Sequence, residues 1–324
     1  MKKCRIFNKL NACWLGLIAI IYLSLYVLIS TGIINPVYQT ALLGIGINII
    51  LAVSLNLIIG ITGQFSLGHA GFMCIGAYAT GVMMKQVSAS FVGVLLGMVL
   101  GMLISAVVGL IVAGPTLRLK GDYLAIATLG AGEIIRIIVL NMVITNGAAG
   151  LILKKSVDWP FIFLMVVITL VVITNFGISA PGRACLAIRE DEIAAEAMGI
   201  NTTKYKIIAF VIGAIFASVA GSLYAGSFYV IKPDMFTFNK SIEILVLVVF
   251  GGMGSITGAT IAAIVIGLIN VFLQQFSDIR MIIYGLALVS IMIFRPGGLL
   301  STKEFTFKAI FKYFKNRRAT EWQS

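Results

Sequence analysis

Two opposite charges lie within one long apolar run of this 324-residue chain. Glu133 and Arg136 fall near the middle of residues 122–143. Their spacing of three places both on one face of a helix, within reach of each other. A charge at that depth in hydrocarbon costs at least about 2.5 kcal/mol unless it is paired. Two interpretations stay open: a buried ion pair that holds helices together, or a polar lining for a charged or zwitterionic substrate.

Two glycine-rich segments, residues 63–72 (GQFSLGHAGF) and 251–258 (GGMGSITG), each separate two apolar runs. Glycine and small polar residues break helices and let backbones pack closely. The first segment is either a broken helix beside a transport path or a plain cytoplasmic turn. A second break in the other half of the chain favours a transport site, because corresponding breaks in two halves mark such sites.

His69 is the only histidine of the chain. It either contacts substrate and senses pH, or simply forms hydrogen bonds with its neighbours. The charged pair and the two breaks together give a candidate substrate path that consists of Gln64, Ser66, His69, Glu133, Arg136, Gly252 and Ser255.

Residues 182–206 form a polar island in apolar surroundings. They carry four basic residues (Arg183, Arg189, Lys204, Lys206) and four acidic ones (Glu190, Asp191, Glu192, Glu196). Such a segment between membrane spans must lie outside the bilayer, where another protein can reach it. It is either an ordinary solvated loop or a docking surface.

A short helix is expected within the island, over residues 191–198. Acidic residues at its start suit the positive end of the helix dipole, and its alanines favour helix. Gly199 stands where a helix usually ends, and Asn201 or Thr202 is suited to cap the next helix.

The composition is that of a membrane protein: 60% of the residues are hydrophobic, 11% are charged, and the mean hydropathy is +1.07. A soluble domain has about 25% charged residues. We therefore expect an all-α, polytopic bundle without the alternating pattern of a membrane barrel. About ten spans are predicted, which divide into two sets of five: 14–34, 40–60, 70–84, 91–113, 122–143, 160–179, 207–231, 239–253, 258–274 and 279–294.

The basic residues orient these spans. With the N-terminus inside, the cytoplasmic segments hold 17 of the 24 lysines and arginines, so both termini are expected in the cytoplasm. Residues 1–324 are read as one transmembrane domain with an uncleaved first span, a cytoplasmic loop at 180–206 and an amphipathic tail at 301–324 that lies on the anionic inner leaflet. The net charge of +12 marks this cytoplasmic side, and nucleic acid is not an expected partner.

The motifs of several enzyme classes are missing. The sequence contains no GxxxxGK[ST], HExxH or GxSxG, and its four cysteines form no CxxC. We therefore expect a transport subunit that is not an enzyme, with no ATPase site, no cofactor and no metal.

At this point several motifs resemble a known family. Residues 63–80 (GQFSLGHAGFMCIGAYAT), 120–136 (KGDYLAIATLGAGEIIR), 182–210, 251–260 (GGMGSITGAT) and 295–300 (RPGGLL) look like the branched-chain amino-acid ABC importer permeases, LivM branch. The resemblance implies a bacterial inner-membrane permease with a partner permease of the H branch. It also implies two cytosolic ATPases and an extracytoplasmic substrate-binding protein.

Within the island, Ala194, Ala195 and Gly199 are spaced as in the loop with which such permeases dock on their ATPases, although Ile193 stands at the usual glutamate position. The resemblance implies an ATPase-coupling set of Asp191, Glu192, Ala194, Ala195, Glu196 and Gly199. Three alternatives stay open: a permease for urea or short amides, an ion-coupled secondary transporter and a scaffold that does not transport.

Overall fold

The computed structural model describes residues 9–31, 35–87, 90–116, 119, 121–272 and 285–286. The chain divides into two compact units, Met1–Thr40 with Lys303–Ser324 and Ala41–Thr302. In the first unit, α1 (Lys9–Ser30) covers most of the first predicted span. α2 (Pro36–Asn56) begins there and continues into the second unit. The predicted tail 301–324 lies outside the described residues.

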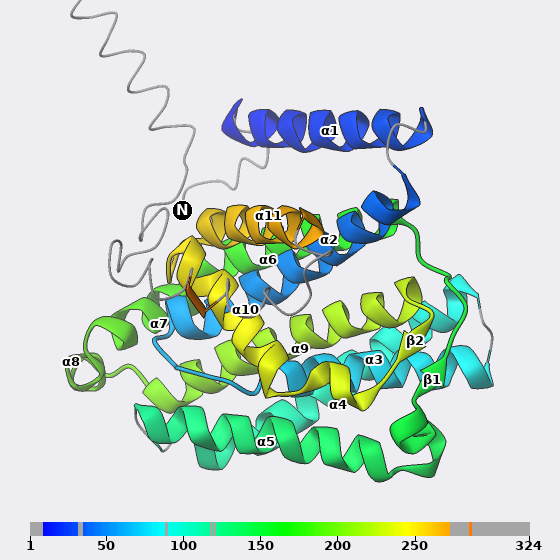
Figure 1. The fold of residues 1–324 in the computed structure, drawn as a ribbon. Coiled ribbons are helices and arrows are strands. Elements are labelled where there is room, and N and C mark those ends of the chain that lie inside the picture. Colours follow the sequence, from blue (N-terminus) through cyan, green and yellow to red (C-terminus); the bar gives the residue numbers. More distant parts are fainter. Residues whose placement is uncertain are drawn as a thin grey trace, which may run out of the picture. The chain divides into compact units, whose positions relative to one another are not determined.

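Three helices pack closely at the centre of the second unit: α3 (His69–Gln86), α4 (Phe91–Thr116) and α9 (Thr202–Ser227) (Figure 1). Gly76 on α3 faces the carbonyl group of Ser218, and Gly221 on α9 faces the carbonyl group of Met73. A Cβ at either glycine would overlap these carbonyl atoms. Small residues let membrane helices approach this closely, so α3 and α9 form the core of the bundle.

Several helices, α4 among them, also carry exposed apolar faces. Leu103 and Ile111 on α4, Ile126 on α5 (Asp122–Asn141) and Leu164 on α6 (Trp159–Ile178) are all more than half exposed. A soluble monomer rarely exposes such extended apolar surface. A lipid bilayer accepts it, because each helix satisfies its own backbone hydrogen bonds. These faces are suited to contact lipid.

Within the described residues, five helices are long and apolar enough to cross a membrane: Tyr38–Ile61, Phe91–Thr116, Asp122–Asn141, Trp159–Ile178 and Thr202–Ser227. The number rises to six if the bent pair Phe238–Gly251 and Ile256–Val271 is one span. The all-α helical class is confirmed, but about ten spans are not. The predicted span 70–84 corresponds to α3, which is not one of the five, and 279–294 lies outside the described residues except for 285–286.

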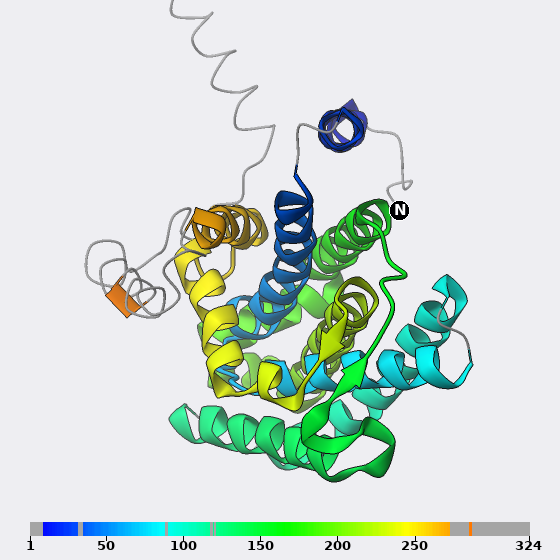
Figure 2. The same cartoon turned by 45° about the vertical axis from the view of Figure 1, so that its right-hand side comes forward.

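Both glycine-rich segments interrupt helices, as predicted. After α2 the chain forms the π-helix η1 (Leu57–Ile61), and residues 62–68 are not helical before α3 begins. α10 (Phe238–Gly251) and α11 (Ile256–Phe272) are bent by 120° relative to each other at a short break (Figure 2). Gly252 and Gly254 in that break have φ values of +107° and +97°, which favour glycine.

The two ends of the second unit differ. One end carries α7 (Ala180–Glu190) and α8 (Glu192–Ala197), and the opposite end carries β1 (Leu151–Ile152) and β2 (Val230–Ile231), which pair antiparallel (Figure 1). Short 3-10 helices η2 (Val143–Thr145) and η3 (Gly147–Ala149) precede β1, and η4 (Pro233–Phe236) follows β2. Helix α7 was not predicted from the sequence.

Candidate functional site

The short helix α8 is built by local capping. The Asp191 carboxylate is its N-cap and accepts hydrogen bonds from the backbone N–H groups of Ile193 (2.9 Å) and Ala194 (3.1 Å). Gly199 ends the turn with a φ of +81°. Asn201 caps α9 by accepting a hydrogen bond from the N–H of Lys204 at 3.0 Å. The predicted helix is confirmed, but it is one residue shorter at each end than the predicted 191–198, because Asp191 is its N-cap and Met198 is its C-cap.

The two charged residues of α8, Glu192 and Glu196, bind side chains at the start of α9. Glu192 pairs with Lys206 on α9, with 2.6 Å between the carboxylate and the ammonium group. The Thr202 hydroxyl donates a hydrogen bond of 2.7 Å to the Glu196 carboxylate. Ala195 is only 4% exposed. These contacts fasten α8 to the start of α9, which is the core helix of the bundle.

The outward surface of this loop includes two large apolar side chains. Ile193 is 77% exposed and Met198 is 83% exposed, beside the exposed Ala194 and Gly199. Large apolar side chains at a polar end of a membrane protein mark an interaction surface. Ile193, at the position where the sequence resemblance led us to expect glutamate, is thus exposed, while Glu192 is paired with Lys206.

Arg189, at the end of α7, reaches into the bundle. Its guanidinium donates a hydrogen bond of 2.5 Å to the carbonyl oxygen of Gly60 in η1, and it pairs with Glu190 at 2.9 Å. A Cβ built on Gly254, in the α10–α11 break, would lie 2.8 Å from the guanidinium. Arg189 therefore joins the polar loop to both helix breaks. The sequence analysis counted it only as a cytoplasmic charge.

Asn56 joins the two breaks directly. Its amide donates a hydrogen bond to the carbonyl oxygen of Ser255 (2.9 Å), and its amide oxygen accepts one from the N–H of Gly254 (2.8 Å). Gly60 lies so close to Gly254 that a Cβ would overlap the backbone there. Of the predicted path residues, Gly252 and Ser255 therefore belong to this joint between η1 and the α10–α11 break.

Three predicted path residues lie at or just before the start of α3, and all are buried: Gln64, Ser66 and His69. The ring nitrogen Nε2 of His69 is 2.8 Å from the Ser54 hydroxyl on α2. In the part of the chain that the structure describes, the Gln64 side-chain amide forms no hydrogen bond. His69 thus forms a hydrogen bond with a neighbouring helix, as one of its two interpretations expects.

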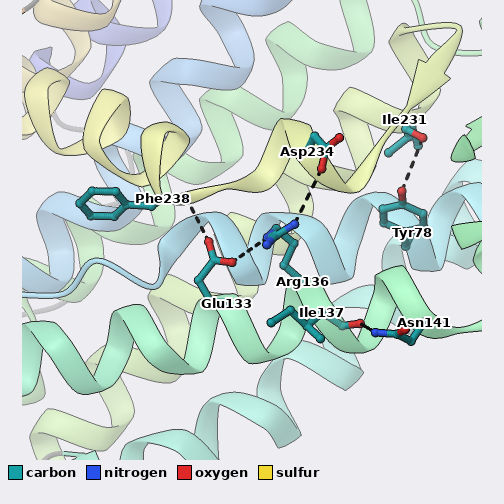
Figure 3. A network of polar contacts seen from close by, with 8 residues as sticks. All are labelled: Tyr78, Glu133, Arg136, Ile137, Asn141, Ile231, Asp234 and Phe238. Atoms are coloured by element: carbon teal, nitrogen blue, oxygen red, sulfur yellow. Dashed lines mark hydrogen bonds and ion pairs between the residues drawn. The ribbon is translucent and has the colours of Figure 1, made fainter. Parts of the chain in front are cut away.

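Glu133 and Arg136 form an ion pair, with 2.7 Å between Arg136 Nε and Glu133 Oε2. Figure 3 shows both on α5, facing the segment that leads into α10. Glu133 accepts a hydrogen bond of 3.2 Å from the N–H of Phe238, and Arg136 lies 3.8 Å from Asp234. The pair thus fixes the start of α10 against the middle of α5.

A cavity of about 320 Å³ lies where η4 meets α10. It is lined by Met73 from α3, Tyr224 from α9, and Asp234, Met235, Phe236, Thr237, Asn239, Lys240 and Glu243. None of the predicted path residues lines it. The ion pair between Lys240 and Glu243 (3.0 Å) borders it, and both side chains are half-buried. Neither Lys240 nor Glu243 was among the candidate site residues expected from the sequence.

The chain matches a family model described as a branched-chain amino acid transport system permease component, over residues 37–293. Together with the apolar helices, this match indicates a multi-pass membrane protein. No solved structure matches the chain.

Relatives with two different names are similar to it. The high-affinity branched-chain amino acid transport system permease protein LivM of Escherichia coli strain K12 is 35% identical, and that of Salmonella typhimurium is 33% identical. Each match covers 84% of this chain and 71% of the relative. The LivH permease protein of Escherichia coli is 30% identical over 49% of this chain and 51% of its own length.

Proposed function

Because the chain belongs to the family of branched-chain amino acid transport system permease components, we propose that it is one membrane-spanning subunit of an ATP-driven importer for these amino acids. Its LivM and LivH relatives are permease proteins of transport systems, and a permease subunit is not itself an enzyme. In this proposal two separate cytosolic ATPases hydrolyse the ATP, and the sequence of this chain contains no P-loop.

The proposed topology has about ten spans in two sets of five within a single domain of the bacterial inner membrane. Both termini are cytoplasmic, and the tail 301–324 lies on the inner leaflet. The lysine and arginine bias of the sequence supports this orientation. It puts α8 on the cytoplasmic side and β1 and β2 towards the outer side of the membrane (Figure 1).

The observation that carries the proposal is the outward apolar surface of α8. Ile193 and Met198 are exposed, while Glu192 and Glu196 bond within the chain. In the proposed mechanism this surface docks on an ATPase, with Asp191, Ala194, Ala195 and Gly199 shaping it. ATP-driven movement then reaches the helix breaks through Arg189, since that side chain contacts Gly60.

The remaining partners follow from the relatives and the topology. A permease of the H branch would pair with this chain, as the similarity to LivH over half its length supports. A substrate-binding protein would deliver the amino acid at the outer end. The path residues predicted from the sequence, Gln64, Ser66, His69, Glu133, Arg136, Gly252 and Ser255, stay a prediction.

The proposal can be tested by reconstitution. The chain is co-purified with the permease, ATPases and binding protein encoded beside it, and uptake is measured in proteoliposomes. We expect uptake of leucine, isoleucine or valine that requires ATP and the binding protein. Uptake of urea or short amides instead would show that the chain belongs to a transporter of those compounds. Uptake by this chain alone under an ion gradient, or complex assembly without any uptake, would overturn the proposal.

A further inference from the structure

The cavity at the start of α10 lies at the depth of the middle of a span. The N–H of Phe238, the first residue of α10, donates to Glu133 near the centre of α5, and Asp234 lies beside Arg136 (Figure 3). The chain between β2 and α10 is therefore irregular at membrane depth. Irregular backbone is stable there only where it is buried in protein or lines a water-filled cavity.

The cavity has the size and wall of a site for a small ligand. Its volume of about 320 Å³ is at the lower end of the range for ligand pockets, about 300–1,000 Å³. Met73 and Phe236 give it an apolar wall, and both side chains are buried. Lys240, Glu243 and Asp234 add one positive and two negative groups. The cavity thus offers an apolar surface beside charges of both signs.

A second, much smaller hollow shares Lys240 and Glu243 with this cavity. It holds about 20 Å³ and is lined by Lys240 and Glu243 together with residues of α2 and α11, among them Asn48 and Asn270. The side-chain oxygen of Asn270 is buried without a hydrogen-bond partner in the described part of the chain. A polar atom left unpartnered in a membrane protein is costly, so water or a polar ligand is suited to this hollow.

We propose that Lys240 and Glu243 form a transient binding site for the zwitterionic head of the amino acid, at the point where the two hollows meet. Without ligand the two side chains pair with each other. A zwitterion exchanges the Lys240–Glu243 pair for two pairs, because its carboxylate binds the Lys240 ammonium group and its ammonium group binds the Glu243 carboxylate. The apolar wall receives the branched side chain.

This site would hold its ligand weakly, because binding breaks an existing ion pair. Weak binding suits a position along a transport path, since the ligand must also leave. Asp234, whose side chain is 78% exposed, lies at the same cavity and can hold the ammonium group before it reaches Glu243. Intramembrane ionisable residues most often mark such paths. The proposal rests on the proposed function, because it assigns the place where that function handles its substrate.

The test uses the complete transport complex in proteoliposomes, with radiolabelled leucine and ATP inside. Each of Lys240→Met and Glu243→Gln should lower leucine uptake about tenfold or more, since each removes a charge-assisted contact. The charge-swapped double variant K240E/E243K keeps an i,i+3 ion pair on α10. We expect it to restore the purification yield and thermal stability of the complex, but not leucine uptake.

Matched controls lie on the same side of the membrane in the proposed topology. Lys155 and Asp158 are exposed, line neither hollow, and Asp158 makes no side-chain cap on α6. Complexes with Lys155→Met or Asp158→Asn should transport leucine as the unchanged complex does.

A competition assay adds a second measurement. Excess leucine should block labelled uptake, while isoamylamine and isocaproate, which each keep one charge, should not. A substrate-binding protein could impose the same selectivity. The uptake measured for the Lys240 and Glu243 variants therefore decides whether the site exists.

Full leucine uptake by either single variant, or restored uptake in the charge-swapped variant, would overturn the proposed site. The Lys240–Glu243 pair would then have a structural role only. If the unchanged complex transports no amino acid at all, the proposed function itself fails. The two failures are therefore distinguishable in the same experiment.

Discussion

The guanidinium of Arg189 donates a hydrogen bond of 2.5 Å to the carbonyl oxygen of Gly60. Arg189 lies at the end of α7 in the polar loop, whereas Gly60 lies in the π-helix that follows α2. A π-helical turn leaves some backbone groups poorly paired, so a charged donor is well placed there. The contact gives the loop a direct connection to the broken helices.

Arg189→Ala should separate ATP hydrolysis from transport. The loop would still dock on its ATPase, but α7 would lose its connection to Gly60. We expect leucine uptake by the complete complex to fall about tenfold, because a hydrogen bond to a charged group contributes about 1.5–3 kcal/mol. ATP hydrolysis should fall much less. Arg183→Ala is the matched control, because Arg183 lies on α7 too and, among the described residues, its guanidinium donates to the nearby carbonyl group of Ile178. Equal losses in both variants would argue against a special role for Arg189.

Ile193→Asp and Met198→Asp should weaken assembly with the ATPase. Both side chains are exposed, so the change adds a charge to the surface without disturbing the packing of this chain. The ATPase retained by the tagged permease after size-exclusion chromatography measures the effect. Val143→Asp is the control. It also adds a charge at an exposed apolar residue, because Val143 is 94% exposed, but it lies in η2 after the end of α5 and not in the polar loop. Undiminished assembly of both α8 variants would exclude this surface as the docking site.

The pair formed by Glu133 and Arg136 should show energetic coupling. Glu133→Gln keeps a side-chain oxygen for the N–H of Phe238, and Arg136 still has Asp234 at 3.8 Å. Arg136→Met instead leaves the Glu133 carboxylate without its cation, so we expect it to be the more harmful change. The double variant should lose less stability than the sum of the single variants, with a coupling of about 0.5–3 kcal/mol. Thermal unfolding in detergent measures all three, and strictly additive losses would contradict the pairing.

Gly76→Ala should destabilise the bundle strongly. A Cβ at Gly76 overlaps the carbonyl group of Ser218, so α3 and α9 would have to move apart. Gly130 on α5 provides the control, because a Cβ there has no neighbour within 4 Å. We expect Gly130→Ala to be neutral or slightly stabilising, since alanine is the better helix former by about 1 kcal/mol. Equal expression and melting temperature of the two variants would refute the close packing.

The rate at which the Cys185 thiol reacts should show whether α7 stays packed against the bundle. It is buried, and burial raises the pKa of its thiol to about 11. The reactive thiolate is therefore scarce at pH 7 and becomes more abundant only as the pH approaches that value. In a variant with Cys4, Cys13 and Cys74 replaced by alanine, a maleimide should react slowly at pH 7 and faster once Arg189→Ala is added. Rapid labelling without that change would show that α7 is not held in place.

Local features of this protein could be predicted from its residues. Asp191, Gly199 and Asn201 cap and end their helices through contacts a few residues away, so α8 and the start of α9 follow from sequence. Helix α7 had a similar signal that was overlooked. Ser179 accepts a hydrogen bond from the N–H of Gly182, and Pro181 lies in the first turn, which is the usual pattern of a helix start.

Contacts between distant segments could not be predicted in this way. Phe238 meets Glu133 only because the chain after β2 turns inward to the middle of α5. That depth depends on how α3, α5 and α9 pack, and no local pattern encodes it. For this reason the sequence did not indicate Lys240 as a site residue, and the cavity beside it was not anticipated. The Glu133–Arg136 pair was anticipated, because its two members lie one helical turn apart.

The amide of Asn56 uses its donor and its acceptor on the same short turn, at Ser255 and Gly254. No other side chain of this size offers that combination. Aspartate at position 56 lacks the donor, leucine lacks both groups, and glutamine is one methylene longer in a site where Gly60 already leaves no room. One carboxamide therefore holds the break between α10 and α11 through two hydrogen bonds, and we expect this position to tolerate few replacements in a mutational scan.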